Sequence, residues 1–67
     1  MDSQQVLNRI KGKRNEKGIT QDEMALKLGI TQKTYNLKEN GKAEFTLAEL
    51  SAILVILGCN FDDIFLP

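Results

Sequence analysis

The residues whose types and spacing could do chemistry lie between positions 32 and 40, where amide and amine side chains recur at helical spacing. On a helix that begins at position 32, five residues project to one side: Gln32, Lys33, Asn36, Leu37 and Asn40. Asparagine and glutamine can bond N6 and N7 of adenine, lysine can reach O6 and N7 of guanine, and leucine can contact the thymine methyl group. The segment therefore predicts a face that reads DNA in the major groove, with Gln32, Lys33, Asn36 and Leu37 as base-reading residues.

Leu37 is the unusual member of this face, because an exposed leucine gains nothing in water. Three interpretations stay open from the sequence. The side chain can pack on a thymine methyl group, it can pack on a protein partner, or the helix can be rotated slightly so that the leucine is buried. Tyr35 is expected to face the core, and Lys38 is expected to cover apolar surface with its stem while its ammonium group reaches solvent.

Two short helices joined by a tight turn must position this face. Thr20 and Glu23 have the spacing of a capping box, which begins the first helix. Gly29 follows where a helix commonly ends in a left-handed residue, Thr31 can cap the second helix, and Gly41 can end it. The turn is only about three residues long, as the DNA-reading helix-turn-helix requires.

Phosphate contacts are expected around the starts of these two helices, because helix N-termini present free amides and a positive dipole to anions. Such contacts position a protein on DNA without reading sequence. The candidate residues are Gln21, Thr31, Thr34, Asn40 and Lys42, with Lys11 or Lys13 further out.

The charge distribution supports an anionic partner although the net charge of the 67-residue chain is zero. All nine basic residues lie at or before Lys42, together with five acidic ones, so this part carries +4. The remainder has four acidic residues and no basic one, so it carries −4. A chain polarised in this way has a basic end that can meet phosphate, although an ordinary solvated surface is the alternative.

The whole chain is predicted to be all-α, a single domain of residues 1–67 with five helices. Their expected limits are residues 3–16, 21–28, 32–40 and 47–57, with a last short helix that starts at Asn60. Gly12 lies inside the first helix, where it either costs stability or marks a close approach to another helix or to phosphate.

The fourth helix is apolar nearly all round. Leu47, Leu50, Leu54 and Leu57 are expected to form one stripe, with Ile53 and Ile56 beside it. One stripe is enough for the core of so small a protein. The remaining apolar residues of this helix, together with Ile64, Phe65 and Leu66, form a plausible dimer face. The alternative is that the other helices simply wrap around this one.

Several classes of protein are disfavoured by composition. With no histidine and with Cys59 as the one cysteine, the chain has no predicted metal, disulfide or cofactor site. The sequence offers no paired carboxylates and no glycine-rich phosphate loop. Nothing in it therefore indicates an enzyme or a small-molecule substrate. The lone cysteine fits a reduced, cytoplasmic setting. The longest apolar run, residues 52–57, is too short to span a bilayer, so we expect no membrane association.

The strings GITQDEMA, LGIT and ENGK, with Arg14 before them, resemble the phage repressor and Cro family of helix-turn-helix DNA-binding domains. The resemblance runs from about Val6 to Phe65. It implies a compact five-helix lambda repressor-like fold and a buried pair of Arg14 with Glu39. It also implies that Gln21 holds a phosphate and braces Gln32, and that Asn40 and Lys42 anchor the backbone just past the recognition helix.

The leading hypothesis is a small regulator of transcription that binds double-stranded operator DNA as a homodimer, encoded by a bacterium or a phage. Its two half-sites are expected about one helical turn, ~34 Å, apart. The alternative is a protein-binding module that keeps the same fold, such as an antirepressor or antitoxin-like partner. Leu37 and the zero net charge support that alternative.

Overall fold

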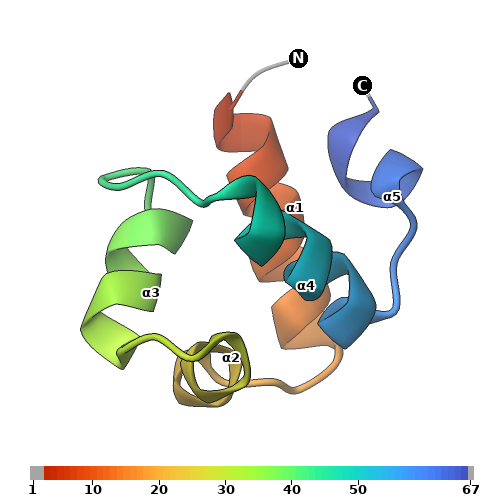
Figure 1. The fold of residues 1–67 in the computed structure, drawn as a ribbon. Coiled ribbons are helices and arrows are strands. Elements are labelled where there is room, and N and C mark those ends of the chain that lie inside the picture. The colour runs from red at the N-terminus through yellow and green to blue at the C-terminus, as the bar shows by residue number, and fades with distance from the viewer. Residues whose placement is uncertain (1–2, 67) are drawn as a thin grey trace.

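The structure, a computed structural model, describes residues 3–66, and this part of the chain folds into helices without a strand (Figure 1). The all-α prediction is confirmed, and the helices are α1 (Ser3–Glu16), α2 (Gln21–Leu28), α3 (Gln32–Glu39), α4 (Leu47–Leu57) and α5 (Phe61–Phe65). Within the described residues, no helix has the length and apolar character needed to cross a membrane.

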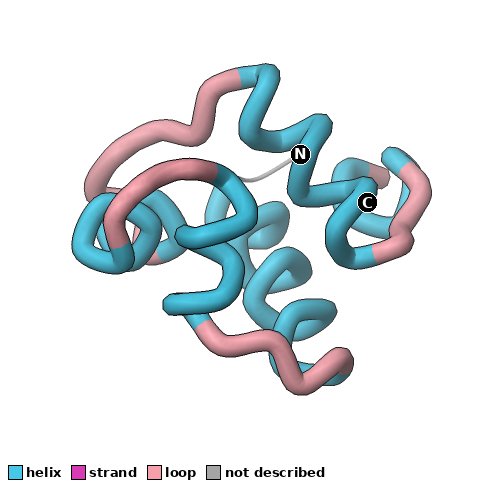
Figure 2. The backbone as a smooth tube through the Cα atoms, turned by 60° about the horizontal axis from the view of Figure 1, so that its bottom comes forward, coloured by secondary structure: helices cyan, strands magenta, loops and turns pink. Residues whose placement is uncertain are grey.

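Local signals in the sequence set the ends of α2 and α4. Thr20 and Thr46 each accept a hydrogen bond from the backbone N–H three residues on, and the glutamates at those positions bond back to the cap. Gly29 and Gly58 end the same two helices with φ angles of 73° and 64°, in the left-handed region that glycine adopts without a steric penalty. The tube in Figure 2 shows the short loop that leaves α2 and the longer loop from α3 to α4.

The five helices surround one apolar core. In Figure 1, α4 crosses in front of α1, while α2 and α3 lie on one side and α5 on the other. Each of the five contributes at least one side chain that is almost wholly withdrawn from water: Ile10, Met24, Ala25, Tyr35, Ile53, Leu57 and Ile64. Full burial of one large apolar side chain stabilises the fold by about 1.5–3 kcal/mol.

The structure corrects two expectations about the apolar C-terminal part. Leu47 is not in the buried stripe: it is 81% exposed, on the side of α4 that also carries Val55, which is 82% exposed. These two residues are eight positions apart and therefore share a helix face. Ile64 is not part of an outer face either, because it is buried in the core, whereas Phe61 and Leu66 are exposed.

α5 is held against α1 by a contact that the sequence did not indicate. The guanidinium group of Arg9 donates to the backbone carbonyl groups of Ile64 and Leu66 at the end of α5. Carbonyls at a helix end lack partners within the helix, so a cationic donor is favourable there.

Gly12 has no close neighbour. A Cβ atom added at Gly12 meets no heavy atom within 4 Å outside the helix's own turns. Among the described residues, nothing therefore supports the close helix–helix approach that was one interpretation of this glycine, and its lost helix propensity remains as a cost.

Candidate nucleic-acid interface

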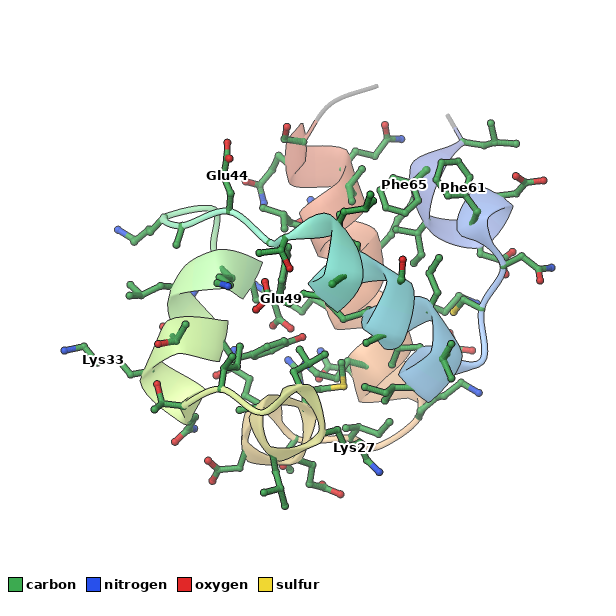
Figure 3. The ribbon with its side chains drawn as sticks, in the orientation of Figure 1. Lys27, Lys33, Glu44, Glu49, Phe61 and Phe65 are labelled. Atoms are coloured by element: carbon green, nitrogen blue, oxygen red, sulfur yellow. The ribbon has the colours of Figure 1, made fainter. Side chains whose placement is uncertain are left out.

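α3 presents two chemically different sides. Tyr35 and Glu39, four residues apart, are buried, with Glu39 only 1% exposed. The opposite side carries the residues predicted to read bases, all of them exposed: Gln32, Lys33, Asn36 and Leu37, followed by Asn40. In Figure 3 the labelled Lys33 points away from the body of the protein. Leu37 is 36% exposed, so the helix is not rotated far enough to bury it.

A buried ion pair fixes the inner side of α3 to α1. Arg14 Nε and Nη2 each lie 3.0 Å from a different oxygen of the Glu39 carboxylate, in the two-point geometry that arginine and carboxylate favour. Arg14 Nη1 also donates to the Ile19 carbonyl at 2.8 Å, which ties in the segment leading to α2. The pair that the family resemblance implied is thus formed, and it joins three parts of the chain.

Glu39 gains further donors from two other residues. The Tyr35 hydroxyl donates to Oε2 at 2.5 Å and Gln21 Nε2 donates to Oε1 at 3.2 Å. Burial by itself would raise the pKa of Glu39, but hydrogen bonds from Arg14, Tyr35 and Gln21 outweigh burial and lower the pKa below its ordinary value. Burial raises the pKa of Tyr35, and the bond to Glu39 raises it further. The carboxylate is therefore ionised and the tyrosine protonated at neutral pH.

Gln21 connects this buried cluster with the exposed side of α3. While Nε2 of Gln21 donates to Glu39, its Oε1 accepts a hydrogen bond of 3.2 Å from Asn36 Nδ2. The resemblance implied that Gln21 braces Gln32; in the structure of the protein without DNA, the partners of the Gln21 side chain are Glu39 and Asn36. The link from Gln21 to Asn36 was missed because it joins two helices and leaves no local signal in the sequence.

The start of α3 is arranged by two threonines. Thr31 Oγ1 accepts from Thr34 N at 3.1 Å, as an N-cap does, and donates to Thr34 Oγ1 at 2.9 Å. Within residues 3–66 the Thr34 hydroxyl group donates to no acceptor, so its proton can serve a partner outside the protein. Of these two predicted phosphate contacts, Thr34 is the one with a side-chain donor to offer.

Lys38 differs from its prediction, because its ammonium group is held in an ion pair with Glu49 instead of extending into solvent. Lys38 Nζ lies 2.6 and 2.7 Å from the two oxygens of Glu49, and both side chains are mostly buried. Glu49 also completes the cap of α4, and the bond from Lys38, followed by that from the Thr46 backbone, lowers its pKa. This second ion pair fixes α3 to α4.

The basic residues are divided between interior and surface. Arg14 and Lys38 are used in internal ion pairs, so neither is available to phosphate. Lys11 lies beside the end of α3, with Nζ 3.5 Å from Asn40 Oδ1. Lys13 shares its helix face with Arg9, which contacts α5, so the structure brings Lys11 and not Lys13 next to α3. Lys42 is exposed just past α3.

Comparison with known proteins identifies the family to which this helix-turn-helix belongs. The sequence profile of the helix-turn-helix family matches residues 10–64, which includes α2, the turn and α3 and most of the chain. No curated protein and no solved structure matches the chain. The match covers well over half of the 67 residues. The chain therefore belongs to the helix-turn-helix family of repressor and Cro type, whose members are DNA-binding regulators.

Proposed function

We propose that this protein is a sequence-specific regulator of transcription of the Cro or repressor kind, which inserts α3 into the major groove of operator DNA. The observation that carries the proposal is the two-sided character of α3. Its inner side is fixed to α1 and α4 by ion pairs through Glu39 and Lys38. Its outer side offers amide, amine and aliphatic groups that match base edges. A recognition helix needs both properties, because base contacts require accurate placement.

The phosphate contacts that accompany this docking come from the rim of α3. Thr34 has a free hydroxyl proton at the start of the helix, and Lys11, Asn40 and Lys42 lie around its end. These residues set the position of α3 in the groove without reading sequence. Such a regulator acts where bacterial or phage DNA lies, in the cytoplasm, and needs no cofactor.

A homodimer is the form expected on DNA, because one short helix in a groove binds weakly and symmetric dimers match two half-sites. α3 and α5 lie on opposite sides of the molecule in Figure 1. Exposed apolar side chains occur on α4, on α5 and just past the end of α5: Leu47, Val55, Phe61 and Leu66. A second copy that packs on these side chains would leave α3 free for DNA.

Leu37 fits a contact with a thymine methyl group. It lies on the same outer side of α3 as Lys33 and Asn36 and keeps part of its side chain in water. Replacing the contacted thymine by uracil removes one methyl group, worth about 0.8 kcal/mol, or roughly fourfold in affinity. The loss should be absent in the Leu37→Ala protein. An equal effect of uracil on both proteins would mean that Leu37 contacts something else.

The test of the function is selection of duplexes from a random pool, followed by titration of the selected duplex across salt concentrations. We expect a two-fold symmetric consensus and an affinity that falls with salt, since each neutralised phosphate adds about −0.9 to the log–log slope. The matched variant Lys42→Ala should reduce that slope by roughly one unit. The absence of any enriched sequence would overturn the proposal, and it would favour the protein-binding module that the exposed leucine also allows.

A further inference from the structure

We propose that Asn36 is the adenine-reading residue of this interface, and that Glu39 and Gln21 set its orientation from inside the protein. The inference rests on the proposed function and deepens it, because it assigns one base preference to one residue. The hydrogen bonds that carry it run from Arg14 through Glu39 and Gln21 to Asn36.

The direction of these bonds follows from the charge on Glu39. An ionised carboxylate accepts hydrogen bonds and cannot donate them. Of the two ends of the Gln21 amide, only the NH2 group can therefore face Glu39, and Nε2 lies 3.2 Å from Oε1. Arg14 supports this state of Glu39, since its guanidinium group bonds both carboxylate oxygens at 3.0 Å.

The same constraint is passed on to Asn36. Because Nε2 of Gln21 faces Glu39, its Oε1 faces outward, and an oxygen there requires a donor. Asn36 supplies it, with Nδ2 at 3.2 Å from Gln21 Oε1. Asparagine amides can usually be turned over at little cost, but turning this one would place two oxygens against each other. The charge on Glu39 thereby fixes the orientation of Asn36, through the hydrogen bonds of Gln21.

The hydrogen-bonding groups of Asn36 that Gln21 does not use are complementary to the major-groove edge of adenine. One N–H group is used by Gln21, which leaves the second N–H and Oδ1, and within residues 3–66 this oxygen has no hydrogen-bond partner. Asn36 itself is exposed on the outer side of α3. A donor and an acceptor side by side complement N7 and the N6 amino group of adenine. No other base pair presents that arrangement at one base edge in the major groove.

If Gln21 served only in packing or in phosphate binding, its substitution would have a different effect on DNA binding. A tie between α2 and α3, or a contact with phosphate, affects binding to all sequences together. An orienting role affects discrimination at one base pair. The readout that separates these roles is therefore the ratio of affinities for adenine and for the other bases at each operator position.

The experiment uses the duplex selected by the wild-type protein and all single-base changes in one half-site. Asn36→Ala should abolish the preference for adenine at one position, a loss of roughly 5- to 150-fold in discrimination. Gln21→Met, which keeps the side-chain length but removes the amide, should weaken the preference at that same position by at least about threefold, a change of ~0.6 kcal/mol. Gln32→Ala, a matched change of a glutamine outside the hydrogen-bond chain, should leave that position unaffected.

The possible results separate this inference from the proposed function. Gln21→Ala, measured in parallel, removes the same bonds with a shorter side chain, and circular dichroism verifies that each variant folds. A wild-type consensus whose adenine preferences all survive in Asn36→Ala overturns the inference alone. So does a preference at the Asn36 position that is unchanged in both Gln21 variants. A wild-type protein that enriches no sequence overturns the inference and the proposed function together.

Discussion

Replacing Arg14 by alanine is expected to destabilise the protein by about 3–5 kcal/mol, the cost of removing one partner of a buried ion pair. Arg14 provides two of the four hydrogen bonds that the Glu39 carboxylate accepts, and a further bond to the Ile19 carbonyl. In the variant, Glu39 stays buried with only Tyr35 and Gln21 as donors. Its charge is then uncompensated, and this accounts for most of the loss.

The loss is large in relation to the whole protein. A chain of 67 residues has a total stability of roughly 3–10 kcal/mol. At about 4–8 °C per kcal/mol for a domain of this size, the melting temperature should fall by roughly 12–40 °C. Thermal unfolding followed by far-UV circular dichroism measures this fall. Lys13→Ala, on the same helix but in no ion pair within residues 3–66, should stay within about 0.5 kcal/mol of wild type.

Two outcomes distinguish an uncompensated charge from lost packing. A double variant, Arg14→Met with Glu39→Met, removes both charges while keeping apolar volume, and it should be more stable than Arg14→Ala. The reasoning is refuted when Arg14→Ala and Lys13→Ala melt at the same temperature. It is equally refuted when the double variant is less stable than the single one.

Three further predictions concern stability. Gly12→Ala should raise the free energy of unfolding by about 1 kcal/mol, and Gly58→Ala should lower it by a similar amount because of its positive φ of 64°; a chemical denaturation curve for each gives the sign. Lys38→Met should cost about 1–2 kcal/mol by the same measurement, since Glu49 loses a charged donor, and an unchanged midpoint would contradict the ion pair. Because the pKa of Glu39 is lowered on folding, its contribution is fully present above the unfolded pKa of about 4.3 and is lost as the pH falls through the folded value. Melting temperatures measured from neutral pH downward should therefore fall in acid, and the fall should be smaller in Glu39→Gln.

The helix ends could be predicted from the sequence because the signals that set them are local. Thr20 and Thr46 each carry a glutamate three residues on, and Gly29 and Gly58 each follow the last turn of a helix. A cap is formed by residues that are neighbours in the chain, so its geometry is already present in the spacing. The exposed side of α3 could be predicted for the same reason, because helical spacing determines it once the first residue of the helix is known.

The contacts between helices could not be read in this way. Leu47 lies near the apolar stripe in sequence, yet no other element covers it, and helical spacing does not contain that information. Ile64 was assigned to an outer surface because the short α5 has too few residues to show a periodic pattern. The pairing of Lys38 with Glu49 joins residues eleven positions apart on different helices. Such partners depend on how the helices pack.

Stability alone does not account for a charged pair beneath α3. Removing a carboxylate and a guanidinium group from water costs about as much as their attraction returns, so two well-packed apolar residues can stabilise a fold equally well. An apolar pair, however, has no acceptor for the Gln21 amide. Glu39 has one, and Gln21 in turn bonds Asn36 on the exposed side. The buried charge thus does what an apolar core cannot: it gives a direction to a side chain on the surface. On this reasoning the Arg14→Met, Glu39→Met protein keeps its fold and its affinity for phosphate but loses discrimination at the adenine position.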